Sequence, residues 1–130
     1  MCTYRTPREF ALRFAGDPAL ADGRLRLPVE QYLFARGDAY VASYRPESFV
    51  CLSESIDLFR IDAREVRVPV TAVAVPEDQL VPYADMQAFA HRLPAGRLVT
   101  LESVYGHDAF LKEGTALRQI FADCLEGPAR

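Results

Sequence analysis

The spacing of apolar residues along the chain changes near residue 65. In residues 1–65 apolar positions recur mostly every three or four residues, which is typical of amphipathic helices. Beyond that point the stretch VRVPVTAVAV (66–75) is apolar at almost every position, as in a strand that is buried on both faces. The pattern therefore divides the chain into a helical part, residues 1–65, and a mixed part, residues 66–130.

Three helices are expected in the helical part. The stretch TPREFALRF carries the signals of a capping box: Thr6 is the N-cap, Pro7 fills the first helical position and Glu9 stands three residues after the cap. GDPALADGRLRLP, with two glycines and two prolines, is expected to be a loop. VEQYLFARGDAYVASY, interrupted at Gly37-Asp38, and RPESFVCLSESIDLF, which enters at a proline, supply the other two helices.

The mixed part has the order strand, helix, strand, helix. After residues 66–75, YADMQAFAHRL is expected to be a helix, RLVTLES a strand and DAFLKEGTALRQIFADCL one final helix. This order favours two parallel strands joined by a right-handed crossover. Two strands rarely form a stable sheet alone, and no other strand is expected in residues 1–65. The sequence therefore predicts an α/β fold that is part of a larger sheet.

Charge and hydropathy exclude two classes of partner. The net charge is −3 and Lys112 is the single lysine, so a basic surface for nucleic acid is not expected. No apolar run approaches the roughly 20 residues of a membrane span. The first ten residues, MCTYRTPREF, lack the apolar centre of a signal peptide, so a cytoplasmic location is expected.

The three cysteines suggest no bridge and no metal site. Cys2, Cys51 and Cys124 lie far apart, which fits neither a zinc spacing nor a disulfide framework. Reduced, mostly packed thiols are expected, with Cys51 in the core.

Charged side chains follow both predicted strands of the mixed part. Glu77 and Asp78 come after the first strand, and His107 and Asp108 come after the second. Sites in open parallel sheets form outside the carboxyl ends of the strands. A carboxylate that binds one imidazole nitrogen fixes the tautomer of a general base, and α/β-hydrolases have the chain order Ser, Asp or Glu, His. We expect Asp78 and His107 to form a catalytic pair, although either alone would often be an exposed loop residue.

The other histidine and the serines do not complete a triad. His91 lies within an amphipathic helix and is expected on the surface. No G-x-S-x-G string occurs, and none of the serines has the context of a nucleophile elbow (Ser43, Ser48, Ser53, Ser55 and Ser103). The nucleophile is therefore expected in sequence outside these 130 residues, and the chain is expected to be inactive alone.

Four stretches of the chain resemble, in order, the carboxyl-terminal half of the homoserine O-acyltransferases, which are α/β-hydrolase-fold enzymes of methionine biosynthesis. These stretches are TYRTPREFALRF, VEQYLFARGDAYVASYRPESFVCLSESIDLFRID, VPVTAVAVPEDQLVP and YGHDAFLKE. YGHDAFL is the most specific, while LSESIDLFRID and EDQLVP look closest to the succinyltransferase branch. Either an acetyl or a succinyl donor fits the resemblance.

The resemblance implies a role for four residues. Asp78 matches the triad acid, His107 the triad base, Asp108 the carboxylate that receives the amino group of L-homoserine, and Arg5 the cation that holds its carboxylate. A zwitterionic amino acid needs one cation and one anion held apart, and a guanidinium suits a carboxylate. Arg5 could instead be a solvated side chain before the helix cap, and Asp108 an N-cap of the last helix.

The resemblance also implies partners and an organisation. Acyl-CoA would be the co-substrate, with no further cofactor and no metal. Residues 1–65 would form a helical lid that also mediates homodimerisation, and residues 66–130 the βαβα portion of the core. Two alternatives remain open. The chain could belong to another α/β-hydrolase-fold enzyme, such as an esterase or a serine O-acyltransferase, or it could be a non-catalytic remnant that acts as an interaction module.

Overall fold

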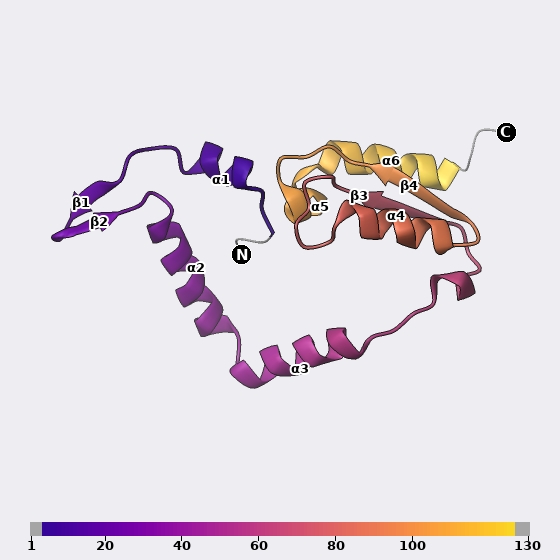
Figure 1. The fold of residues 1–130 in the computed structure, drawn as a ribbon, viewed down its shortest axis with the longest axis horizontal. Helices are drawn as coiled ribbons and strands as arrows, with labels where there is room; N and C mark the ends of the chain where they lie inside the picture. The colour runs from indigo at the N-terminus through magenta and orange to yellow at the C-terminus, as the bar shows by residue number, and fades with distance from the viewer. Residues whose placement is uncertain (1–3, 127–130) are drawn as a thin grey trace. The chain divides into compact units, whose positions relative to one another are not determined.

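The computed structural model describes residues 4–126, which divide into two units (Figure 1). Residues 4–11 and 62–126 belong to one unit, and Leu12–Ile61 form the other. The first unit thus joins the beginning of the described chain to its last 65 residues. No helix between residues 4 and 126 has the length and apolar character that a membrane crossing requires.

The first unit is built on two parallel strands, as the sequence predicts. β3 (Val70–Ala74) pairs with β4 (Gly96–Thr100), and the register places Ala72 opposite Leu98. α4 (Tyr83–Arg92) connects them, and Figure 1 shows the strands lying between α4 and α6 (Gly114–Glu126). The mixed α/β class and the parallel pairing are therefore confirmed, and they are consistent with part of an α/β-hydrolase fold.

The core of this unit gathers where the two strands end. Val75 and Leu101, the residues directly after β3 and β4, are buried together with Ala109. Leu117 of α6 packs against this cluster. On α4 and the residue that follows it, Ala90 and Leu93 are buried, and Met86 and Phe89 are half-buried.

Burial within β3 differs from the prediction of a strand covered on both faces. Ala72 and Ala74 are buried, whereas Val70, Thr71 and Val73 are only half-buried. The strand also begins four residues later than the apolar stretch, because Pro69 lacks the N–H that ladder pairing needs.

The predicted final helix is divided into three pieces. A 3₁₀ turn, η2 (Gly106–Asp108), leads into α5 (Ala109–Lys112), and α6 follows after Glu113. Glu113 leaves the helical region, with φ −92° and ψ 49°, and its carboxylate accepts a hydrogen bond from Ser103 Oγ at 2.8 Å. The expectation of one continuous helix was therefore wrong, because a tertiary contact interrupts it at Glu113.

α1 (Pro7–Arg13) begins with the cap that the sequence indicates. The Glu9 backbone N–H donates to Thr6 Oγ1 at 3.0 Å, which satisfies one of the amides left open at a helix start. The prediction of Thr6 as N-cap is confirmed.

A β-hairpin in the second unit replaces a predicted loop. β1 (Ala19–Ala21) pairs antiparallel with β2 (Arg24–Arg26). The two residues between them, Asp22 and Gly23, have φ values of 53° and 71°, which is the pattern of a type I′ turn. The prediction of a loop without strands was wrong because the Asp-Gly pair, a strong hairpin signal, stood among other turn formers.

The two longer helices of the second unit have the predicted places but not the predicted burial. α2 (Glu30–Ser43) continues through Gly37-Asp38 without a break, and α3 (Pro46–Leu58) begins at Pro46. Neither helix contains a buried residue. Cys51, expected in the core, is exposed on α3, so that prediction was wrong. A short 3₁₀ turn, η1 (Ala63–Glu65), precedes β3 in the first unit.

Gly96 offers a test of the packing between α4 and β4. A Cβ atom at this position would lie 2.5 Å from the Ala90 carbonyl oxygen and 2.7 Å from Leu93 Cβ. Gly96→Ala is therefore expected to lower the free energy of unfolding by about 1–3 kcal/mol, as overpacking does. Urea denaturation followed by circular dichroism would measure it.

Gly114→Ala is the matched control, since it lies in the same unit and nothing is within 4 Å of its added Cβ. Its effect should stay within about 1 kcal/mol, the scale of helix propensity. Equal midpoints for the two variants would contradict the packing described above.

Candidate active site

Asp78 and His107 meet at the carboxyl edge of the parallel strands. Asp78 follows β3 and His107 lies in η2 after β4, and their side chains join through Oδ2 and Nδ1 at 2.9 Å. The Asp78 side chain is 10% exposed and that of His107 is 26% exposed. The two residues singled out from the sequence are thus in direct contact, partly shielded from water but reachable.

The Asp78 carboxylate is held by its own loop. Its Oδ1 accepts the backbone N–H groups of Leu80 at 2.8 Å and Val81 at 3.0 Å, the arrangement of an Asx turn. Its other oxygen, Oδ2, faces the imidazole. Because an ionised carboxylate can only accept, His107 Nδ1 carries the proton of this hydrogen bond and Nε2 is left as the acceptor.

Aromatic rings pack on the His107 imidazole. Tyr4 meets it edge-on, with ring centroids 5.3 Å apart, and Phe110 does so at 5.9 Å. Such edge-to-face contacts restrict rotation of the ring. The imidazole is therefore oriented by one charged hydrogen bond and two aromatic neighbours.

A cluster of charges lies next to this pair. Arg5 Nε is 3.0 Å from Asp108 Oδ2, and Arg5 Nη1 is 2.7 Å from Glu9 Oε1. All three side chains are largely buried. Asp108 makes no side-chain hydrogen bond that caps α5. The two residues that the family resemblance assigns to substrate binding, Arg5 and Asp108, are thus brought together as an ion pair.

Sequence reasoning missed two neighbours of this site. Tyr4 was not singled out, and Glu9 was assigned only a place in the helix cap. Tyr4 reaches His107 through a contact between residues roughly 100 positions apart, which no local pattern signals. Glu9 belongs to the site through Arg5, only four positions before it. His91 is exposed on α4, as expected. Among residues 4–126 there is no group of three or more potential ligands that could hold a metal ion.

A cavity of about 260 Å³ adjoins the acid–base pair. Asp78 and His107 contribute its polar groups. The rest of its wall is apolar and comes from the strands, their following loops and the helices (Val73, Ala74, Val75, Val81, Met86, Leu101, Phe110 and Leu117). A small, mostly apolar space with a histidine and a carboxylate at its wall is the usual form of a candidate active site.

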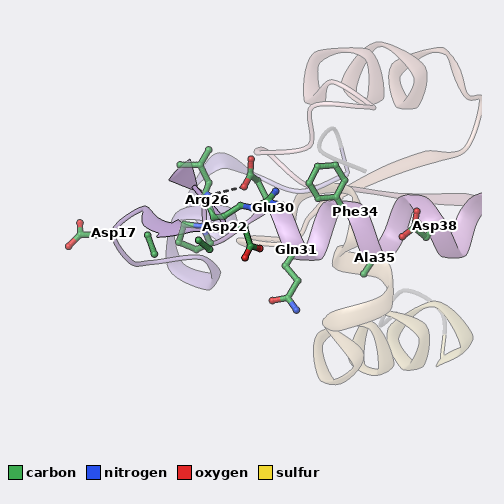
Figure 2. A pocket seen from close by; sticks show the side chains of 12 residues that line it. Asp17, Asp22, Arg26, Glu30, Gln31, Phe34, Ala35 and Asp38 are labelled. Carbon is green, nitrogen blue, oxygen red and sulfur yellow. Dashed lines mark hydrogen bonds between the residues drawn. The ribbon is translucent and has the colours of Figure 1, made fainter. Parts of the chain in front are cut away.

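A larger cavity, of about 740 Å³, lies within the second unit (Figure 2). Its wall comes from the β-hairpin and from α2, which contributes Glu30, Gln31, Phe34 and Ala35. None of its twelve lining residues is a histidine, cysteine or serine, and none belongs to the predicted site. Size alone therefore does not identify it as a reaction site.

Asp78→Asn provides a test of how the imidazole is held. The single oxygen of the new amide would still be needed by the Leu80 and Val81 N–H groups, so its NH₂ would face His107 Nδ1. The neutral imidazole is then expected to change from the Nδ1–H to the Nε2–H tautomer, the wrong one for a base. Nitrogen-15 NMR of the ring reports the tautomer directly.

Glu77→Gln is the control, because this neighbouring acid is exposed and should leave the His107 tautomer as it is. An Asp78→Asn chain that kept the Nδ1–H form would contradict the proposed geometry.

No family model matches the chain. A homoserine O-succinyltransferase of Xanthomonas campestris is 51% identical over 126 residues, which are 96% of this chain and 34% of that protein. Homoserine O-acetyltransferases of Deinococcus radiodurans and Mycobacterium leprae are 32% and 31% identical, over 87% and 95% of this chain and 34% and 36% of theirs. The chain spans about a third of the length of these relatives. It is therefore a homologue of the homoserine O-acyltransferases over that third.

Proposed function

We propose that the chain supplies the acid–base pair and the amino-acid-binding charges of a homoserine O-acyltransferase, which transfers an acetyl or succinyl group from acyl-CoA to L-homoserine. The observation that carries this proposal is the 2.9 Å contact between His107 Nδ1 and Asp78 Oδ2 at the ends of adjacent parallel strands. The similarity to proteins named homoserine O-succinyltransferase and O-acetyltransferase supports the choice of substrate.

In the first step a serine hydroxyl attacks the thioester carbonyl carbon of acyl-CoA. His107 Nε2 takes the hydroxyl proton while Asp78 stabilises the imidazolium through Nδ1–H. The carbon–sulfur bond breaks, the proton passes from His107 to the departing CoA sulfur, and the acyl group remains on the serine as an ester.

In the second step the hydroxyl of homoserine attacks that ester. His107, neutral again, accepts the homoserine proton and returns it to the serine oxygen as the serine ester bond breaks. The products are the O-acylated amino acid and the free enzyme. Nε2 of His107 accepts the proton in both steps. The imidazole must therefore be in the Nδ1–H tautomer at the start of each step.

Homoserine would be held by its two charges. In this proposal the substrate ammonium binds Asp108 and its carboxylate binds Arg5, so the internal ion pair is exchanged for two ion pairs to the substrate. Glu9, at 2.7 Å from Arg5 Nη1, would keep the guanidinium in place during the exchange. Because these groups are largely shielded from water, their charges act more strongly than on an open surface.

The nucleophile belongs, in this proposal, to sequence outside these 130 residues. Three of the serine hydroxyls are already engaged: Ser43 and Ser55 donate to carbonyls of their own helices and Ser103 donates to Glu113. We therefore propose that the chain is inactive alone, because loss of one triad member removes most of the rate acceleration.

The remaining parts of the proposal concern the helical segment. Residues 1–65 would act as the lid and as the surface for a homodimer, and residues 66–130 as the βαβα portion of the core. The exposed apolar side chains of α2 and α3 support a covered helical surface. The cytoplasmic location stays a prediction.

A chimera tests the function. This chain would replace the matching third of the Xanthomonas campestris homoserine O-succinyltransferase, with 51% identity to support its folding. We expect acyl transfer to homoserine, measured by release of free CoA thiol, and no transfer by the 130-residue chain alone. His107→Ala should lower kcat by about 10³-fold or more, whereas His91→Ala on exposed α4 should not. Equal effects of the two substitutions would contradict the role of His107.

Asp108→Asn in the same chimera separates an amino-acid acyltransferase from an esterase. Loss of the charge that receives the ammonium should raise KM for homoserine by about 10- to 100-fold, the worth of a hydrogen bond to a charged group. Hydrolysis of a simple ester, which has no ammonium, should change little. Glu102→Gln, at an exposed position before the same loop, is the control. An unchanged KM for homoserine would favour the esterase alternative.

A further inference from the structure

The loop that carries His107 is attached to the start of α1. The Val104 carbonyl accepts a hydrogen bond from Thr6 Oγ1 at 2.6 Å, and the Asp108 N–H is 3.3 Å from the Tyr4 carbonyl. These contacts join segments about 100 residues apart in the sequence. They bracket His107, one on each side of it.

Thr6 is the central residue of this attachment. The Thr6 side chain is buried, and it is the largest fully buried side chain among the described residues. The Thr6 hydroxyl acts both as donor and as acceptor: it donates a hydrogen bond to the Val104 carbonyl and accepts one from the Glu9 N–H. Its methyl group faces Gly106, where an added Cβ would lie 3.2 Å from Thr6 Cγ2.

The two sides of the acid–base contact differ in what fixes them. Asp78 is held within its own loop by the Leu80 and Val81 N–H groups. The His107 loop contains Gly106 at φ +58°, a left-handed conformation that glycine adopts without strain. The His107 loop is held from within by the Tyr105 N–H, which donates to Ser103 Oγ at 3.1 Å, and from outside by the Thr6 hydroxyl on the Val104 carbonyl.

We propose that Thr6 is a positioning residue for His107: its hydroxyl holds the loop at Val104 so that the imidazole stays on Asp78. The catalytic meaning of this role rests on the proposed function, but the positioning itself is measurable without any acyl transfer. Thr6 acts through the backbone and touches no reacting atom in this assignment.

Thr6→Val and Thr6→Ser in the 130-residue chain test the proposal. Valine keeps the shape and removes the hydroxyl, whereas serine keeps the hydroxyl and loses the methyl group. Nitrogen-15 NMR should show that Thr6→Val converts the single Nδ1–H tautomer of His107 into a mixture, and that Thr6→Ser retains the single form. The chain's other histidine, exposed His91, is the internal reference, and its nitrogen-15 signals should not change. A folded Thr6→Val chain with the unaltered His107 signal would overturn the proposal, as would a Thr6→Ser chain that behaved like Thr6→Val.

If Thr6→Val does not fold, hydrogen exchange of the unmodified chain tests whether Thr6 holds the His107 loop. The Glu9 amide reports the Thr6 cap. The Asp108 amide, shared between the Tyr4 carbonyl at 3.3 Å and the Tyr105 carbonyl at 3.2 Å, reports the loop together with its attachment to Tyr4. If Thr6 holds the two together, both amides should show the same protection factor and the same response to low urea. An Asp108 amide that exchanges freely while the Glu9 amide stays protected would overturn the proposal.

Failure of this inference is distinguishable from failure of the proposed function. A His107 tautomer that responds to Thr6→Val, combined with a chimera whose acyl transfer survives His107→Ala, would leave the positioning role standing and remove the proposed function. The opposite pair of results would remove the positioning role alone.

Discussion

The parallel register of β3 and β4 decides which loops can meet. Both strands run the same way, so the loops after Ala74 and Thr100 leave from one edge of the sheet. The Leu101 N–H donates to the Ala74 carbonyl at 2.9 Å, which carries the pairing one residue past the strands. Val75 and Leu101 then enter the core with Ala109, which lies directly after η2. The same apolar cluster thus anchors both loops, and Asp78 and His107, 29 residues apart, meet because of it.

Much of this arrangement follows from local rules, and so the sequence predicts it. The cap at Thr6 needs only a hydroxyl followed by proline and an acid, and the β3–α4–β4 unit follows from a change in apolar period. A parallel unit then places the acid of one loop near the histidine of the next. The hairpin at Asp22-Gly23 was also a local signal, but it was outweighed by neighbouring prolines and glycines.

The features of the fold and the site that the sequence did not predict depend mostly on contacts between residues that are not neighbours in the sequence. The break at Glu113 depends on the Ser103 hydroxyl ten residues earlier, and the Arg5–Asp108 ion pair joins residues about 100 positions apart. A helical or strand period carries no information about such pairs. Glu9 is a different case, because its contact with Arg5 spans only four residues and was missed although the spacing is local.

The burial of α2 and α3 is another property that the sequence pattern alone does not predict. α3 forms where the sequence predicts a helix, yet Phe49, Leu52 and Ile56 are all more than half exposed. Period identifies which face of a helix is apolar, whereas burial depends on a second surface that covers it. A 13-residue helix is marginal in water without such packing. The homodimer proposed from the family resemblance would supply that surface from a second copy of the same helices. The exposed apolar face of α3 is therefore where the proposed homodimer would make its contact.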